Sequence, residues 1–250
     1  MILTLPDPWK SLREECYGNV EPEAALEAVT VPIDAGDGPA FSLSRGGGDF
    51  WRHIETLPAY SAGASYGSRE KLRHDMDRRT GLNKKLIELG HHTPLEAVQF
   101  NFSVAGISKA SGAQVSRHRI GQGHVSSSRR FQEQHQAFVY PMLAYLTDEA
   151  QAKSVLQKMS ETNRRAVELY RDLRENGGLK KEDARRVIPV SSAQERVWWI
   201  NARALRDFFR LRLARDAEWE VRRLAAMLYN IVIQVTPSLF EDIKVTGFEK

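Results

Sequence analysis

Residues 98–104 alternate apolar and polar side chains, and this alternation is the strongest constraint that the sequence places on the fold. A period of two over seven positions is typical of a β-strand that buries one of its faces. The residues after 131 show a helical period instead, and we expect helices over residues 132–146, 148–176, 181–186 and 193–234. The sequence therefore predicts a chain that combines a strand with a largely helical C-terminal half.

The segments before this half are shorter. Residues 1–57 contain five prolines and a run of three glycines, so we expect an acidic, irregular extension with one helix near residues 21–28. The pattern then predicts a helix from Ser68 to Leu89 with Gly90 as its stop signal, a short helix over residues 108–118, and a loop over residues 121–128.

Composition excludes several classes of protein. About 42% of the residues are hydrophobic and 27% are charged, which is ordinary for a folded globular chain and excludes a disordered or fibrous one. No apolar run approaches the ~20 residues that a membrane span requires, and we expect a cytoplasmic protein. The single cysteine, Cys16, cannot form an intramolecular disulfide or a cysteine-based zinc site.

The positive charge is concentrated after residue 60. Residues 1–60 hold four basic and ten acidic side chains, whereas the remaining 190 residues hold 32 basic and 22 acidic ones. Dense arginine suits an anionic ligand, because a planar guanidinium makes paired, charge-assisted hydrogen bonds to phosphate. No sequence signature of a nucleic-acid-binding module accompanies the arginines, so the pattern favours a nucleotide-sized phosphate over a nucleic acid polymer.

Residues 117–130 gather the side chains that bind phosphate. Arg117, His118 and Arg119 precede a loop with two glycines, and three serines and two arginines follow it. Hydroxyls and loop amides donate to phosphate oxygens, while arginines neutralise the charge. On composition alone, a polar surface turn between charged helix ends is the alternative.

The order of these residues resembles the signature of the flavin-dependent thymidylate synthases (the ThyX family), Arg-His-Arg-x-x-Ser-x-Asn-Glu-x-Ser-x-Arg-Tyr. Five of its nine specified positions are matched here, by Arg117, His118, Arg119, Ser127 and Arg129. Further segments resemble the family's serine–aromatic element, its Gly-His-x-Thr-Pro-x-Glu box and its C-terminal block, and these are residues 64–66, 90–96, 184–189 and 201–212. The resemblance covers roughly residues 58–240, so we expect residues 58–250 to form the catalytic domain.

The resemblance implies an α/β fold with a central twisted sheet and long flanking helices. It also implies a homotetramer whose active sites are shared between subunits. In one continuous helix, Asn201 and Arg212 lie about three turns apart on the same face, from which Arg203 points away. On this interpretation, one helix could serve two different pockets.

In the resembled family, the protein binds FAD, NADPH reduces it, and the flavin delivers hydride to a uracil nucleotide that receives a one-carbon unit from methylenetetrahydrofolate at C5. The other route to C5 methylation needs a cysteine nucleophile. Cys16 lies in the acidic extension without a histidine near it in the sequence, so a thiolate mechanism is disfavoured. The resemblance thus implies a FAD-dependent uridylate methyltransferase that needs neither a nucleic acid polymer nor a membrane.

The resemblance also assigns roles to individual residues. It implies no metal ligand, and it implies a catalytic role beside the pyrimidine for Arg212. Two positions that hold asparagine and histidine in the family are Asp207 and Asp216 here, which puts two flavin contacts in doubt. The implied FAD contacts are Ser65, Thr93, Arg117, His118, Arg119, Asn201 and Arg203, and the implied nucleotide contacts are Gln114, Ser127, Arg129, Arg185 and Arg212.

Four positions of the signature depart from the family. Gln122, His124, Val125 and Arg130 stand where the family has Ser, Asn, Glu and Tyr, while the anion-binding Ser127 and Arg129 are kept. Replacing a carboxylate by valine is the kind of change that alters sugar preference. The pattern resembles the branch that methylates UMP in nucleoside-antibiotic pathways, such as that of polyoxin. A dUMP-specific thymidylate synthase and a non-catalytic nucleotide-binding relative are the alternatives.

Overall fold

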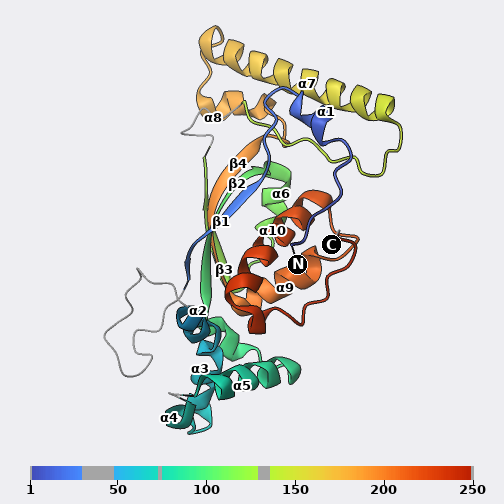
Figure 1. Ribbon diagram of the computed structural model, residues 1–250. Helices are drawn as coiled ribbons and strands as arrows, with labels where there is room; N and C mark the ends of the chain where they lie inside the picture. The colour runs from blue at the N-terminus through green and yellow to red at the C-terminus, as the bar shows by residue number, and fades with distance from the viewer. Residues whose placement is uncertain (1, 30–47, 73–74, 129–135, 249–250) are drawn as a thin grey trace.

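A four-stranded antiparallel sheet organises the structure, a computed structural model that describes residues 2–29, 48–72, 75–128 and 136–248 (Figure 1). Its strands follow the order β1-β2-β4-β3. They are β1 (Glu23–Val29), β2 (Gln99–Ser108), β3 (Gln122–Ser126) and β4 (Ala193–Asn201). The strand expected over residues 98–104 and the mixed α/β class are confirmed.

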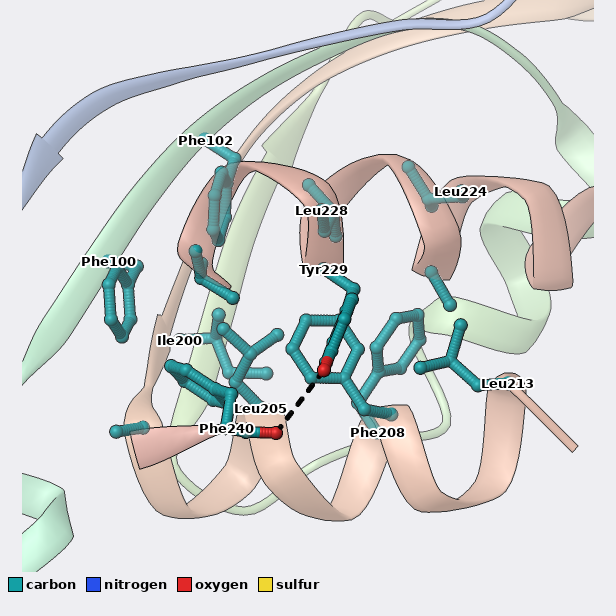
Figure 2. Close-up of a cluster of buried hydrophobic side chains, with 14 of the residues drawn as sticks. Phe100, Phe102, Ile200, Leu205, Phe208, Leu213, Leu224, Leu228, Tyr229 and Phe240 are labelled. Atoms are coloured by element: carbon teal, nitrogen blue, oxygen red, sulfur yellow. Dashed lines mark hydrogen bonds between the residues drawn. The ribbon is translucent and has the colours of Figure 1, made fainter. Parts of the chain in front are cut away.

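One face of the sheet carries the main core. Phe102 pairs with Trp198, and Phe100 pairs with Ile200, so alternate residues of β2 and β4 point to the same side. On that side lie α6 (Lys109–Val115), α9 (Ala202–Arg212) and α10 (Trp219–Val235) (Figure 1). Figure 2 shows side chains of β2, α9 and α10 interdigitating there, with the Tyr229 hydroxyl donating to the Phe240 carbonyl at 3.5 Å.

The opposite face of the sheet is open in the part of the chain that the structure describes. Val125, Val197 and Trp199 project from it and are 65%, 49% and 37% exposed. Gly123 lies beside Trp199, and a Cβ atom on this glycine would come within 2.6 Å of the indole ring. The flat, apolar surface over β3 and β4 therefore depends on a glycine in β3.

Helices extend the fold at both ends of the sheet (Figure 1). A second core, which includes Phe138 and Leu156, lies beneath the long helix α7. One end carries α2 (Gly48–Glu55), α3 (Leu57–Ser65), α4 (Arg69–Leu72), α5 (Met76–Glu88) and the 3₁₀ turn η1 (Thr93–Ala97). The other end carries α1 (Lys10–Glu14), α7 (Glu149–Glu175), α8 (Lys181–Ala184) and the 3₁₀ turn η2 (Arg185–Val187). A last turn, η3 (Pro237–Leu239), follows α10.

Side-chain caps define where several helices begin. Asp148 accepts hydrogen bonds from the amides of Ala150 and Gln151 at the start of α7, and Asn201 accepts from Ala204 at the start of α9. At the end of α5, Gly90 takes a positive φ of 72°, as a helix stop signal requires. The expected helices over residues 108–118 and 148–176 are confirmed as α6 and α7, and the expected helix after Ser68 is divided into α4 and α5.

Three helix predictions are wrong. Most of the expected helix over residues 21–28 lies in β1 instead, because Ala24 and Leu26 pack on the core beside β2 and this packing outweighs the helix propensity of Glu and Ala. Residues 136–146, the described part of the expected helix 132–146, contain no helix. Residues 193–234 form β4, α9 and α10, and the strand period of β4 is hidden because Gln194 and Arg196 occupy buried positions.

The loop predicted over residues 121–128 is also wrong for most of its length, because residues 122–126 form β3. Its two glycines, Gly121 and Gly123, serve close packing against Asn201 and Trp199. The division of the chain at residue 57 stays a prediction, and β1 shows that the N-terminal part contributes a strand to the sheet. Among the described residues, no helix has the length and apolar character that a bilayer crossing needs.

Candidate active site

A first cavity, of about 550 Å³, lies between the end of α3, the turn η1 and the start of α9. It brings together three residues that the sequence assigns to the flavin, Ser65, Thr93 and Arg203. His92 also lines this cavity, and burial lowers the pKa of its imidazole. The cavity therefore offers several hydroxyls, a guanidinium and a histidine, His92, that favours its neutral form.

A second cavity, of about 300 Å³, adjoins the first, because Arg203 lines both. It adds three more predicted flavin residues, His118, Arg119 and Asn201. The Arg203 guanidinium donates to a Glu96 carboxylate oxygen at 2.6 Å, and both side chains are about half exposed. This ion pair fixes the arginine at the junction of the two cavities.

His118 connects the second cavity to Arg212. The Nε of Arg212 donates to Nε2 of His118 at 3.1 Å, so this ring nitrogen is an acceptor and the imidazole is neutral. Burial and, next, the positive charge of Arg212 lower the pKa of His118. The Phe208 ring and the imidazole pack in a T-shaped arrangement, with 5.1 Å between ring centroids.

The expectation that Asn201 and Arg203 point away from each other on one continuous helix is wrong. Asn201 ends β4 and caps α9, so it is not part of a helix that continues from residue 193. Arg203 lines the same cavity as Asn201, and Arg212 reaches this cavity through His118. Gly121 supports the position of Asn201, because its carbonyl oxygen accepts a hydrogen bond from the Asn201 backbone N–H at 2.8 Å. A Cβ atom at residue 121 would clash with the Asn201 side chain.

A third cavity, of about 590 Å³, has the composition of a phosphate site. It contains the predicted nucleotide residues Ser127 and Arg185, which come from the end of β3 and from η2. Lys109 and Arg186 add two further cations, and Glu182 is the acidic residue of the lining. Three cations and three consecutive serines therefore face one cavity.

A fourth cavity, of about 440 Å³, continues from the third, because both are lined by residues 126–128. It follows the open face of the sheet and includes Ser103, Val125 and Val197. The two cavities together form one groove with a cationic end and a more apolar end. We call this the serine groove, after the shared residues 126–128.

The structure separates the four departures from the ThyX signature. Val125 faces the serine groove, whereas His124 lies toward α6, where its Nε2 is 3.3 Å from the Ser116 hydroxyl. Gln122 accepts a short hydrogen bond from the Trp198 indole. Of these three residues, Val125 alone is placed to contact a ligand on the open face. Arg130 lies outside the described residues.

Several predicted site residues are not brought into these cavities. Gln114 is half-buried in α6 and Arg117 is exposed just after it, and neither lines any of the four cavities. Arg129 lies outside the described residues. Asp207 lines the second cavity, and Arg210 lies 3.6 Å from its carboxylate, whereas Asp216 is exposed between α9 and α10.

Sequence reasoning missed Lys109 and Arg186. The available signals were the position of Lys109 at the start of the helix predicted over residues 108–118 and that of Arg186 beside Arg185. It also missed Glu220, a buried carboxyl of α10 that binds Ser108 at the base of α6. Its sequence signal is a carboxylate at the start of the apolar pattern of α10, directly after Trp219.

Comparisons with known proteins agree with this arrangement. The family described as thymidylate synthase complementing protein matches residues 49–238. A flavin-dependent thymidylate synthase of Nitratidesulfovibrio vulgaris is 34% identical over 162 residues, which cover 62% of this chain and 64% of the relative. One of Geobacter sulfurreducens is 31% identical over 163 residues, covering 65% and 68% of the two chains.

A solved structure has the same fold. It is a UMP/dUMP methylase, PolB from Streptomyces cacaoi, bound with 5-Br dUMP. The two structures superpose with a TM-score of 0.72 over 88% of this chain and 93% of the other, at 20% sequence identity. The matched family spans residues 49–238, and the described lining of all four cavities lies within this range. The chain therefore belongs to the thymidylate synthase complementing protein family.

Proposed function

We propose that this protein is a FAD-dependent uridylate methyltransferase, which transfers a one-carbon unit from methylenetetrahydrofolate to C5 of UMP or dUMP with NADPH as the reductant. The observation that carries the proposal is the pairing of two sites. Contiguous cavities gather the flavin-type residues Ser65, Thr93, His118 and Arg203, and the serine groove gathers nucleotide-type residues. The chain spans about two thirds of the flavin-dependent thymidylate synthases that it resembles.

The donor set of the first two cavities fits FAD. Arg119 supplies positive charge for a diphosphate, Arg203 has N–H groups besides the one that it donates to Glu96, and Ser65 and Thr93 supply hydroxyl donors. The negative charge of Asp207 would repel an anion, but the nearby Arg210 guanidinium partly offsets the charge of this carboxylate. Bound FAD would supply hydride chemistry, and these side chains would hold and orient it.

The serine groove suits a nucleoside monophosphate. Ser127 and Arg185 lie at its cationic end, where they would bind the phosphate, and Val125 and Val197 lie at its apolar end, where they would contact the nucleoside. We assign Arg129 and Gln114 to nucleotide binding and Arg117 to FAD binding as well, from their positions in the signature.

The exposed apolar surface of Val125, Val197 and Trp199 supports a homotetramer with shared sites. A second subunit on this surface would cover the apolar end of the serine groove. Light scattering of the purified protein would test this assembly, and a monomer at micromolar concentration would contradict it.

The proposed substrate preference is UMP, with dUMP also accepted, in a nucleoside-antibiotic pathway. It is supported by the exposed Val125 in the groove and by the fold shared with a UMP/dUMP methylase. Product analysis with UMP and dUMP side by side, with methylenetetrahydrofolate and NADPH, tests the function. Strict dUMP use would make the protein a thymidylate synthase, and a colourless protein that cannot be reconstituted with FAD would favour a non-catalytic binding protein.

Substitution of Val125 tests the sugar preference. We expect Val125→Glu to shift kcat/KM toward dUMP by roughly 1–3 kcal/mol, because one polar contact beside the sugar changes while those to phosphate and uracil do not. Steady-state competition between the two nucleotides measures the shift. Val197→Glu, on the neighbouring strand of the same face, controls for charge alone, and an equal shift in both variants would contradict a specific role for Val125.

Substitution of the cysteine tests the chemical route. Cys16 is half-buried, lies 3.5 Å from the Leu12 carbonyl oxygen, and has its pKa raised by burial, all of which disfavour a thiolate nucleophile. We expect Cys16→Ser to retain turnover within about twofold of the unmodified enzyme, within the small effect of most single surface-type changes. Complete loss of turnover in a folded Cys16→Ser protein would contradict the flavin route.

A further inference from the structure

Glu195 places a carboxyl group on the open face of the sheet, within the serine groove. It lies in β4 and is exposed, as is Val197 two residues later on the same face. Arg196, between them, turns to the opposite face and donates to the Gly112 carbonyl oxygen at 3.2 Å. Glu195 is the acidic residue in the described lining of the fourth cavity, so the groove holds a charged hydrogen-bond acceptor beside its apolar end.

Ser127 fixes the register of this glutamate. The Ser127 backbone N–H donates to the Glu195 carbonyl oxygen at 2.9 Å, and the Glu195 backbone N–H donates to the Ser127 hydroxyl oxygen at 3.2 Å. The hydroxyl therefore accepts from β4 and keeps its own proton for donation to a phosphate. Glu195 lies one strand spacing, about 4.8 Å, from this proposed phosphate ligand. In a nucleoside monophosphate the sugar follows the phosphate, so this strand position is placed beside the sugar.

The side chains around Glu195 on this face are apolar. Val125 pairs directly with Val197, which makes Glu195 the diagonal neighbour of Val125 across β3 and β4. Diagonal neighbours lie about 7–8 Å apart, within reach of a long side chain. The position that holds glutamate in the ThyX signature is thus apolar here, and the nearby carboxyl group belongs to the neighbouring strand.

The carboxylate of Glu195 is available to a ligand. In the part of the chain that the structure describes, Glu195 forms its hydrogen bonds through its backbone, while its carboxylate faces the cavity. An ionised carboxylate only accepts hydrogen bonds, and its two oxygens can accept from two donors at once. The 2′,3′-diol of a ribose supplies two adjacent hydroxyl donors, and acidic side chains bind ribose hydroxyls in dinucleotide-binding folds. A 2′-deoxyribose retains one of these two donors.

We propose that Glu195 binds the 2′,3′-diol of the nucleotide ribose and thereby favours UMP over dUMP. This inference rests on the proposed function, and it assigns sugar recognition to a residue outside the ThyX signature. Glu195 lines the fourth cavity but not the third, so its carboxylate is separated from the end of the groove that would hold the phosphate. One groove can then bind an anion at one end and hydroxyl donors further along.

The test is calorimetry on the full-length, FAD-reconstituted protein with UMP, dUMP and 2′,3′-dideoxy-UMP. Glu195→Gln keeps the size of the side chain and removes its charge, which weakens each hydrogen bond from a ribose hydroxyl. We expect affinity to fall about 10-fold for UMP, about threefold for dUMP and less than twofold for the dideoxynucleotide, because two, one and no such bonds are affected.

Glu23→Gln is the matched control. Glu23 is exposed at the start of β1 and lines a cavity next to the serine groove, but it lines neither cavity of the groove itself. The substitution removes the same charge from the same sheet. All three affinities of Glu23→Gln should therefore lie within about twofold of those of the unmodified protein.

The outcomes separate this inference from the proposed function. Equal weakening of all three nucleotides in Glu195→Gln would indicate a structural role and would overturn the proposal. Unchanged affinities in Glu195→Gln would also overturn it, and if Arg185→Gln weakened UMP in the same experiment, the proposed function would stand. An unmodified protein that binds neither UMP nor dUMP would overturn both.

A second measurement does not depend on any variant. The arabino epimer of UMP carries its 2′-hydroxyl on the other face of the sugar ring, so it cannot present two hydroxyls on one side to a carboxylate. The unmodified protein should bind this epimer at least about threefold more weakly than UMP. Equal affinity for the two would overturn the proposal.

Discussion

Replacing Arg212 by alanine should lower kcat/KM for the uracil nucleotide by about 10²–10³. Its Nε is bound to His118 at 3.1 Å, so the guanidinium is held beside the second cavity before any ligand arrives. In the role beside the pyrimidine that its place in the family's C-terminal block implies, Arg212 would be a preorganised donor to negative charge that develops on a uracil carbonyl oxygen, and removing one such donor typically has an effect of this size. Steady-state kinetics at saturating reductant measures the loss.

A second readout distinguishes this role from a structural one. Because the charge of Arg212 lowers the pKa of His118, the pKa of this histidine should rise in Arg212→Ala. An NMR titration of the imidazole would show the rise. Arg171→Ala, which removes an exposed guanidinium from α7, should leave both kinetics and the titration unchanged. Turnover within threefold of the unmodified enzyme in Arg212→Ala would contradict a catalytic role.

The sequence predicts the parts of this fold whose side-chain period is uninterrupted. Residues 98–104 alternate strictly, and they form the centre of β2. The paired strand β4 has the same burial pattern, but two of its four inward positions before Asn201 hold Gln194 and Arg196, so its period resembles that of a polar helix. Those polar side chains are buried because α6 covers them, where Arg196 donates to the Gly112 carbonyl oxygen at 3.2 Å. A tertiary contact of this kind leaves no local signal.

In the candidate site, too, residues with a local sequence signal could be predicted, whereas residues placed by a tertiary contact could not. Ser65, Thr93, Asn201 and Arg203 could be named from the family's motifs, and the structure brings all four to two adjoining cavities. Lys109 could not be named in this way, because its place depends on how α6 packs over β4. Motif matching finds residues whose order along the chain is preserved, whereas a contact through Gln194 across 85 residues depends on the fold.

The largest expected effect on stability concerns Glu220. Burial raises the pKa of this carboxyl to about 7, although hydrogen bonds from Ser108 oppose the rise. The unfolded chain has the ordinary value of 4.5, so between pH 4.5 and 7 the native protein binds a proton that the unfolded protein has lost. The free energy of unfolding must then fall as the pH rises through this window, by about 3 kcal/mol in total from this group.

Glu220→Gln should remove this dependence, because a neutral amide can accept from the Ser108 amide and donate to its hydroxyl without a desolvated charge. Urea unfolding at pH 5 and pH 8 measures the difference. We expect similar stability for both proteins at pH 5 and a variant that is more stable by up to about 3 kcal/mol at pH 8. Glu175→Gln, at the exposed end of α7, is the control, and its stability should follow that of the unmodified protein at both pH values.

A Glu220→Gln protein that loses stability equally at pH 5 and pH 8 would show that the ionised carboxylate, rather than the acid, is the form that the fold requires.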